Sequence, residues 1–314
     1  MVAIKAPTGS VVVAGAAGFL GQHVCTEFAN AGWRVLGLDR NAPGTRDHQA
    51  SSAYQEWVQD DLSSVASITT LLERTKPKAW IHLAGPASVS ASFENPSREF
   101  ESSNLPLARI LDAIRRTNPD VRFLLASSAA VYGEPDHLPI AESQPQRPIS
   151  PYGFHKVHQE LLLDEYRQLY GMRVCKARIF STYGPGIRQL AVWEISRRAM
   201  AGDFSVLGSG EESRDYLYVE DIAGAFMSIL GQSNFYGEAI NVASGNEMRI
   251  VDLSRMVYAA LGSVKDTILC PETRPGNPQR WRADVSKLKA FGFSPTVNMV
   301  EGLSRTISWI RSHA

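Results

Sequence analysis

Three side chains near the middle of the chain, Ser128, Tyr152 and Lys156, could carry out proton transfer. Tyr152 and Lys156 are four residues apart, so they share one face of a helix that begins at Pro151. A phenol is a poor base at neutral pH, and lowering its pKa of about 10 by about three units requires about 4 kcal/mol, which an adjacent ammonium group can supply. A serine hydroxyl can hydrogen-bond the oxygen that gains or loses the proton. These residues predict a tyrosine base assisted by a lysine and a serine.

A buried strand and the helix after it must position these side chains. The apolar run 123–126 predicts the strand, and Ser127 and Ser128 lie at its carboxyl end. After a proline-rich loop, the helix is predicted from Pro151 to about Tyr170. A single Y-x-x-x-K pattern occurs in many helices without a catalytic role, and serines at a strand end commonly serve turns. The assignment therefore depends on the rest of the chain.

A glycine-rich turn lies near the amino terminus. The β-branched run 10–14 predicts a strand, which Gly15, Gly18 and Gly21 follow before a helical pattern that ends at Gly32. Such glycines allow a tight turn, a close approach to a pyrophosphate, and packing of the helix on the strand. The spacing is G-x-x-G-x-x-G, and a plain turn is the alternative interpretation.

Acidic residues follow the next two predicted strands. Asp39 ends the strand 33–38, eighteen residues after Gly21, where a carboxylate can bond both hydroxyls of an adenosine ribose. It also repels a 2'-phosphate and so favours NAD over NADP, although Arg40 weakens this argument. Asp61 follows the strand 54–58 and could reach the adenine amino group.

Strands and helices continue to alternate through the first part of the chain. Helices are predicted over 63–75 and 96–117, and strands over 79–85 and 173–179. Asn104, inside the second of these helices, could brace the active-site strand. Alternation over almost 180 residues predicts a doubly wound parallel sheet of the α/β class.

The pattern changes after residue 180. A loop is predicted over 180–186, helices over 192–202, 222–230 and 299–311, and strands over 204–207 and 239–242. We therefore expect a cofactor domain over 1–180, to which 216–242 returns. A smaller mixed α/β lobe, over 181–215 and 243–314, is expected to bind the substrate.

Composition restricts the partners and the compartment. The 314 residues include 32 basic and 32 acidic ones, which argues against a nucleic-acid or membrane-surface protein. The first nine residues do not form a signal peptide, and no apolar run approaches the roughly twenty residues of a membrane span. The three scattered cysteines predict a reduced, cytoplasmic protein without a metal site.

Taken together, these motifs resemble the extended short-chain dehydrogenase/reductase family, in its nucleotide-sugar epimerase and dehydratase branch. The resemblance covers nearly the whole chain, and its motifs occur in the family's order. They are the glycine turn, Asp39, Asp61, H-L-A-G at His82, S-S-x-x-V-Y-G at Ser127, Y-x-x-x-K at Tyr152, Y-G-P-G at Tyr183, R-D-Y at Arg214 and R-P-G-N at Arg274. The resemblance implies a Rossmann fold and NAD as the cofactor.

The resemblance also implies a role for each matching residue. Ser128 would be the catalytic serine, Tyr152 the base, and Lys156 the residue that tunes Tyr152 and holds the nicotinamide ribose. Cofactor contacts are expected from Gly15, Gly18, Phe19, Leu20, Asp39, Arg40, Asp61, Leu62, Leu83, Ala84, Gly85, Tyr152 and Lys156. Substrate contacts are expected from Ser88, Ser128, Ser181, Val206, Arg214 and Arg274, of which the two arginines would clamp the diphosphate.

The chain departs from the family pattern at several positions. Sugar-nucleotide dehydratases carry an Asp and a Glu after the catalytic hydroxyl residue, whereas this chain has Ala129 and Ala130, which cannot transfer a proton. Elimination of water is therefore disfavoured. Ser181 and Asn277 stand where the family often has Asn and Asp, so the nucleotide base stays open.

These observations favour an NAD-dependent nucleotide-sugar 4-epimerase that acts through a 4-keto intermediate. The alternatives are an NAD(P)H-dependent nucleotide 4-ketosugar reductase, a dehydratase and a regulatory relative without activity. The resemblance further implies a homodimer in which the two long helices pair, with Leu161, Leu162 and Tyr166 at the seam.

Overall fold

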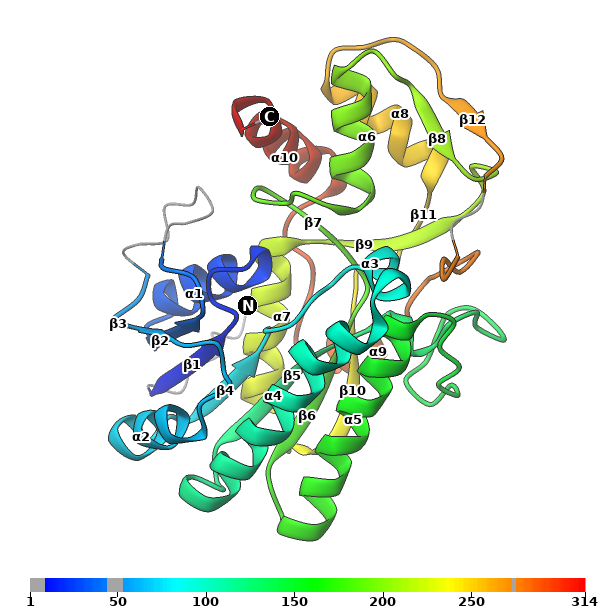
Figure 1. Ribbon diagram of the computed structural model, residues 1–314. Coiled ribbons are helices and arrows are strands. Elements are labelled where there is room, and N and C mark those ends of the chain that lie inside the picture. The colour runs from blue at the N-terminus through cyan, green and yellow to red at the C-terminus, as the bar shows by residue number, and fades with distance from the viewer. Residues whose placement is uncertain (1–8, 44–52, 273–274, 314) are drawn as a thin grey trace.

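Apolar, β-branched runs form the strands of a seven-stranded sheet in the computed structural model, which describes residues 9–43, 53–272 and 275–313 (Figure 1). The strand order is β10-β6-β5-β4-β1-β2-β3, and every neighbouring pair is parallel. The bounds are β1 (Ser10–Ala14), β2 (Arg34–Asp39), β3 (Glu56–Gln59), β4 (Ala79–His82), β5 (Arg122–Ser128), β6 (Val174–Ile179) and β10 (Tyr236–Val242). The predicted doubly wound parallel sheet is confirmed.

Helices cover both faces of this sheet. On one face lie α2 (Val65–Thr75), α4 (Pro96–Thr117) and α5 (Pro151–Tyr170), with α4 beside both of the others (Figure 1). On the other face α1 (Phe19–Asn30) lies beside α7 (Val219–Gln232). Successive residues of β1 point to opposite faces, so Val11 and Val13 enter one core while Val12 enters the other.

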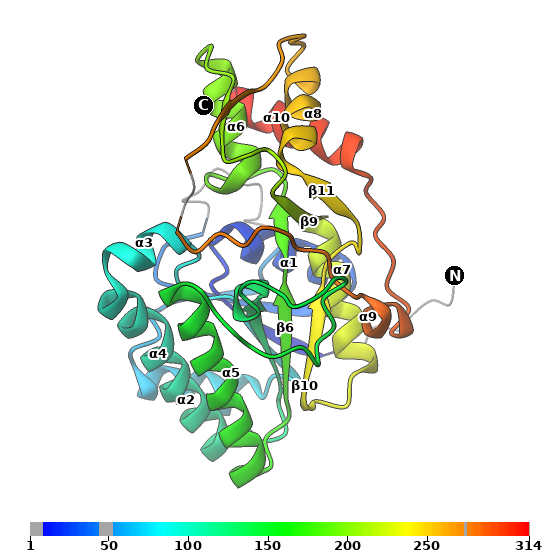
Figure 2. The ribbon, with the colours of Figure 1, turned by 90° about the vertical axis from the view of Figure 1, so that its right-hand side faces the viewer.

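A smaller lobe lies above the carboxyl ends of the large sheet's strands (Figure 2). It contains a three-stranded sheet of β7 (Ser181–Tyr183), β9 (Ser213–Tyr218) and β11 (Glu247–Arg249), and a pair formed by β8 (Ser205–Leu207) and β12 (Ile268–Cys270). Its helices are α6 (Leu190–Met200), α8 (Ile250–Ala260) and α10 (Met299–His313). No helix in the described part of the chain is both long enough and apolar enough to cross a membrane.

The segment after β6 differs from the prediction. The expected loop at 180–186 contains β7, because Thr182 and Tyr183 are buried and the strand pairs in parallel with β9. The ring of Tyr183 also packs edge-on against Tyr218. β9 is a strand of the small sheet, whereas β10 is a strand of the large sheet. α7 lies beside α1 on one face of the large sheet.

Two short helices complete the fold. α3 (Val89–Glu94) lies between the end of β4 and α4, and it contacts both α4 and α5. α9 (Ser286–Ala290) contacts β10 and α7, and Phe293 after it enters the core of the large sheet. The carboxyl-terminal part of the chain, from β11 onward, therefore contributes to both lobes.

Candidate active site

The turns after β1 and β4 lie against each other. Gly15 has a φ of +87°, and a Cβ at this position would lie 2.8 Å from the backbone nitrogen of Ala84. Leu83 N donates to Ala14 O at 2.8 Å, and Gly85 follows with a φ of +133°. Only a glycine fits at position 15, so the backbone at 83–85 lies directly beside the glycine-rich turn.

The amino terminus of α1 begins at this turn, and its backbone N–H groups are suited to an anion. Gly18 caps the helix without a side-chain hydrogen bond, and its own N–H donates to Gly15 O at 3.0 Å. The first N–H groups of a helix have no acceptor within the helix, and its dipole favours negative charge there. Phe19 and Leu20, in the first turn, pack against the core of the small lobe. These N–H groups at the amino terminus of α1 fit a pyrophosphate.

Asp39 ties the end of β2 to the glycine-rich turn. Its Oδ2 accepts a hydrogen bond from Ala17 N at 3.0 Å, and its Oδ1 accepts one from Asn41 N at 2.9 Å. Asn41 Nδ2 also donates to Oδ1, at 3.2 Å. A carboxylate has about four acceptor positions, so about one remains for a ribose hydroxyl. Arg40 is exposed beside it.

Asp61 and Leu62 form a local turn after β3. Hydrogen bonds from the side chain and backbone of Ser63 hold the pKa of the exposed Asp61 below its ordinary value. Leu62 has a φ of +65° and is buried in the core that α2 covers. This left-handed conformation is unfavourable for leucine, and a hydrogen bond from Leu62 N–H to Asp60 Oδ1 at 2.7 Å offsets its cost.

Ser128, Tyr152 and Lys156 come together at the carboxyl end of β5, as predicted. Ser128 ends the strand, and its hydroxyl is hydrogen-bonded to the phenol of Tyr152. The ammonium of Lys156 lies 5.8 Å from the ring centroid of Tyr152 and donates to Ala126 O at 2.9 Å. A proton could pass between Tyr152 and an oxygen that Ser128 also contacts.

The pKa shifts at the site follow from burial. Burial raises the pKa of Tyr152, while its hydrogen bond with Ser128 lowers it. Burial also lowers the pKa of Lys156 to about 8 and, together with the nearby charge of Lys156, lowers the pKa of His82 to about 3. The expected lowering of the Tyr152 pKa by Lys156 is not found in the protein alone: desolvation of the phenolate raises the pKa, and the effect that opposes it is the hydrogen bond with Ser128.

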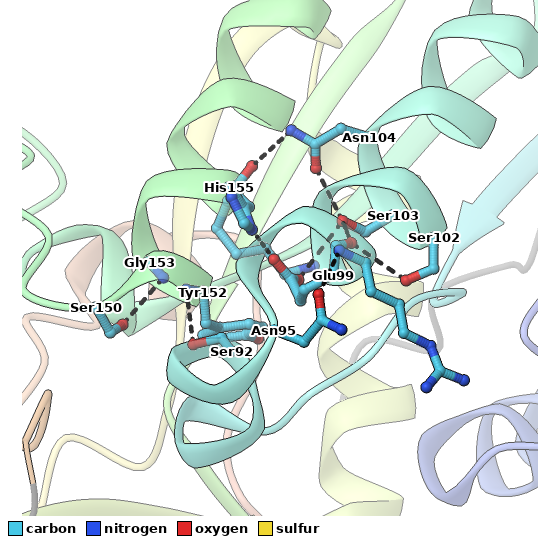
Figure 3. Close-up of polar contacts among 12 residues, drawn as sticks. Ser92, Asn95, Glu99, Ser102, Ser103, Asn104, Ser150, Tyr152, Gly153 and His155 are labelled. Atoms are coloured by element: carbon cyan, nitrogen blue, oxygen red, sulfur yellow. Dashed lines mark hydrogen bonds and ion pairs between the residues drawn. The ribbon is translucent and has the colours of Figure 1, made fainter.

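The first turn of α5 is anchored by serines from two segments (Figure 3). Ser150 Oγ caps the helix by accepting from Gly153 N at 3.1 Å. Tyr152 N lies in the first turn and has no acceptor within its helix; it donates to Ser92 Oγ at 3.1 Å. Ser92 is fully buried on α3 and was not predicted from the sequence.

Asn104 contacts α5 rather than the active-site strand. Its Nδ2 donates to His155 O at 3.3 Å, and its Oδ1 accepts from Gln159 Nε2 at 3.2 Å (Figure 3 shows Asn104 and His155). Gln159 in turn accepts from the ammonium of Lys156 at 3.1 Å. Asn104 therefore braces α5, the helix that carries Tyr152 and Lys156.

A buried ion pair lies behind the site. Arg178 of β6 donates from Nε and Nη2 to the two carboxylate oxygens of Glu160, at 3.0 and 2.7 Å. The same carboxylate accepts from Ser127 Oγ at 2.6 Å. Glu160 lies four residues after Lys156 on α5, and this spacing is the sequence signal from which it could have been found.

The predicted substrate residues are distributed over both lobes. Ser88 caps α3 and accepts from Ala91 N at 3.2 Å, whereas Ser181 begins β7 and Val206 is buried on β8. Arg214 lies on β9, where its guanidinium stacks over the ring of Trp281 at 5.3 Å and donates to Ser213 O at 2.7 Å. Burial lowers its pKa. Arg274 lies outside the described residues.

Two alanines follow Ser128 in a single helical turn. Ala129 is fully buried and Ala130 nearly so, and Ala130 N donates to Ser128 Oγ at 3.1 Å. Neither side chain carries a group that can transfer a proton. Ala130 also packs closely on α5, since a Cβ at Gly153 would lie 2.6 Å from Ala130 O.

Comparisons with known proteins agree with this arrangement. A UDP-glucose 4-epimerase of Mycolicibacterium smegmatis is 30% identical over 312 residues, which cover 96% of this chain and 98% of that protein. A UDP-N-acetylglucosamine 4-epimerase from Methanobrevibacter ruminantium M1, solved with UDP-N-acetylmuramic acid, has a TM-score of 0.88 at 28% identity, over 98% of this chain and 99% of that one. A UDP-glucose 4-epimerase of Thermus thermophilus, solved with NAD, has a TM-score of 0.86 at 29% identity, over 97% of this chain and 100% of that one.

A family model described as GDP-mannose 4,6 dehydratase matches residues 12–306. The name of a family model does not fix the activity of each member. Because the match covers most of the chain and agrees with the fold and the site, the chain belongs to this family of extended short-chain dehydrogenases/reductases.

Proposed function

We propose that this protein is an NAD-dependent nucleotide-sugar 4-epimerase. The observation that carries the proposal is the meeting of Ser128, Tyr152 and Lys156 at the end of β5, where Ala129 and Ala130 supply no second acid or base. Such a site can exchange one proton with a substrate hydroxyl, while a bound NAD would exchange one hydride with the carbon that carries this hydroxyl. It lacks, at these two positions, the groups that the elimination of water requires.

The residues around the glycine-rich turn fit NAD. The open amino terminus of α1 would hold the pyrophosphate, Asp39 the adenosine ribose, and Lys156 the nicotinamide ribose. Asp61 is exposed where the adenine is expected. When bound, the cofactor supplies a hydride acceptor that can return the hydride.

The proposed chemistry begins with the C4 hydroxyl of the sugar. Tyr152 accepts its proton while Ser128 hydrogen-bonds the same oxygen, so the oxygen stays stabilised as it becomes a carbonyl. Arg214, with Arg274, would hold the diphosphate while the sugar turns its other face. Tyr152 then returns the proton, and the C4 configuration is inverted without loss of atoms.

A nucleotide 4-ketosugar reductase is the second candidate. It would use the same three residues but consume NAD(P)H in each turnover. The exposed Arg40 beside Asp39 supports this candidate, because a guanidinium can bind the 2'-phosphate by which NADPH differs from NADH. A dehydratase is disfavoured by Ala129 and Ala130, and an inactive relative by the intact set of three residues.

Incubation with UDP-, GDP-, dTDP- and CDP-hexoses, followed by NMR and mass spectrometry, tests this proposal. An epimerase yields a C4 isomer of unchanged mass and releases NAD(H) on denaturation. A product lighter by one water identifies a dehydratase. Action on a 4-keto sugar alone, with net oxidation of added NAD(P)H, identifies the reductase, and recovery of NADP contradicts the argument from Asp39.

We also propose a cytoplasmic homodimer. The cytoplasm is supported by the three free thiols, Cys25, Cys175 and Cys270, and cell fractionation tests it. The dimer is supported by exposed apolar side chains on α4 and α5, among them Leu105, Phe154 and Leu161. Light scattering tests the dimer, as argued below.

A further inference from the structure

The ammonium of Lys156 is held by two neutral oxygen atoms inside the protein. Of its three N–H donors, one reaches Ala126 O at 2.9 Å and another Gln159 Oε1 at 3.1 Å. Gln159 lies three residues further along α5 and is 1% exposed, so water does not compete with its amide. One donor of the ammonium remains for the active site.

A chain of hydrogen bonds fixes which end of the Gln159 amide faces Lys156. The carbonyl of His155 can only accept, so the Asn104 NH₂ group must point toward it, at 3.3 Å. The oxygen of Asn104 therefore faces the Gln159 NH₂ group at 3.2 Å and also accepts from Ser103 Oγ at 2.9 Å. Only the oxygen of Gln159 is then left for the ammonium.

The charge of Lys156 is not neutralised by a direct partner. Among the ion pairs of the described residues, none joins Lys156 to a carboxylate. The titratable groups that face it are Tyr152, His82 on β4, and Glu160. Glu160 is occupied by Ser127 and by Arg178 of β6, with which it forms a bidentate pair.

We propose that Gln159 is a positioning residue for the active site. It holds the Lys156 ammonium at the end of β5 through a neutral acceptor, which leaves the positive charge and one donor available to Tyr152 and to the nicotinamide ribose. The inference extends the proposed function and rests on it for the roles of Tyr152 and Lys156.

Two substitutions distinguish the effect of the Gln159 oxygen as an acceptor from the effect of its lack of charge. Gln159→Met keeps the length but removes the oxygen, so the ammonium loses one of its two acceptors and its pKa falls below about 8. Gln159→Glu keeps an oxygen but adds a negative charge, which pairs with the ammonium and disfavours the phenolate of Tyr152. Asn104 Oδ1 keeps its hydrogen bond from Ser103 in both variants.

The experiment uses the protein with the NAD(H) that it retains on purification. Titration of Tyr152 is followed by ultraviolet difference spectroscopy, with Tyr152→Phe as the reference. We expect the titration to move up by about one pH unit in Gln159→Glu, whose carboxylate disfavours the phenolate, and NAD(H) to dissociate several-fold faster from Gln159→Met, whose Lys156 ammonium has lost an acceptor. On a nucleotide sugar that the unaltered protein epimerises, kcat should fall by about tenfold or more while KM changes by less than about threefold.

Gln168, exposed on the same helix, provides the matched control. Gln168→Met and Gln168→Glu should leave the titration, the NAD(H) dissociation and kcat unchanged. The inference is overturned if Gln159→Met, folded as judged by its thermal unfolding, shows the NAD(H) dissociation of the unaltered protein, or if Gln159→Glu, folded by the same measure, shows its titration. If no nucleotide sugar is turned over by the unaltered protein, the proposed function fails, while the titration still decides the role of Gln159.

Discussion

Burial of Tyr152 opposes the chemistry that we propose for this residue. Its pKa in the protein lies above the ordinary value of 10.0, because the phenolate loses more hydration than Ser128 returns. Each pKa unit corresponds to about 1.4 kcal/mol of charge stabilisation. Lys156, with a pKa of about 8, keeps most of its charge at neutral pH. In the protein alone, the phenolate is stabilised by the hydrogen bond with Ser128.

At the residue scale, Tyr152→Phe tests the base directly. The ring packing is kept while the proton acceptor is removed, so turnover should fall by at least about 10²-fold with NAD(H) still bound. Tyr170→Phe, an exposed tyrosine at the end of the same helix, is the control and should retain full activity. Turnover of Tyr152→Phe at the unaltered rate would remove Tyr152 from the mechanism, whatever the substrate.

At the element scale, α5 is positioned from several directions. Ser150 caps it, and Ser92 of α3 accepts a hydrogen bond from the N–H of Tyr152 (Figure 3). Asn104 of α4 donates one to the carbonyl of His155. The pair of Glu160 with Arg178 fixes its middle against β6. Removing one partner would leave the other charged and unpaired inside the protein, at a cost of about 3–5 kcal/mol, so we expect this contact to be kept.

Ser92→Ala tests the contribution of α3. The Tyr152 N–H would lose its acceptor in a buried place, so the free energy of unfolding should fall by about 1–3 kcal/mol. Because Tyr152 shifts relative to Ser128, kcat should fall while KM is nearly unchanged. Ser97→Ala, at an exposed position of α4, is the control for both measurements. Thermal unfolding and kcat identical to the unaltered protein would show that α3 does not hold Tyr152.

The sequence predicted those elements whose own pattern determines them. β1 and α4 were predicted with the bounds that the structure shows, since an apolar run bounded by glycine, or a long periodic segment after proline, is a local signal. α3 and β7 gave no such signal. α3 has six residues, two of them serines, and β7 has three residues before Gly184, so both acquire their structure from tertiary contacts.

The same distinction applies to the site. Ser128, Tyr152 and Lys156 were predicted because their spacing and order are read along the chain. Ser92 was not predicted, because its contact with Tyr152 depends on which segments meet in three dimensions. Gln159 was not predicted either: it lies on the same helix as Lys156, but its amide is oriented by Asn104 of α4. Residues with a local signature could be proposed from the sequence, whereas the contacts that position them required the structure.

At the scale of the whole molecule, the outer faces of α4 and α5 are where a second copy is expected (Figure 1). Phe154 and Leu161 are seven residues apart, so they share one face, and they are 52% and 55% exposed. Leu162 and Tyr166, also predicted at the seam, instead pack against the core of their own sheet, because they lie on the inner face of α5. The surface available for pairing is therefore narrower than predicted.

Leu161→Lys tests this surface by placing a charge within the expected seam. If Phe154 and Leu161 are buried between two copies, the unaltered protein is a dimer by light scattering at micromolar concentration, and the variant is a monomer that keeps its thermal unfolding. Val300→Lys, at a 69% exposed position of α10, controls for adding a lysine at an exposed apolar site and should remain a dimer. A monomeric unaltered protein would refute the dimer. A variant that stays dimeric would place the interface on another surface, since a buried, unpaired lysine is too unfavourable to be retained at a seam.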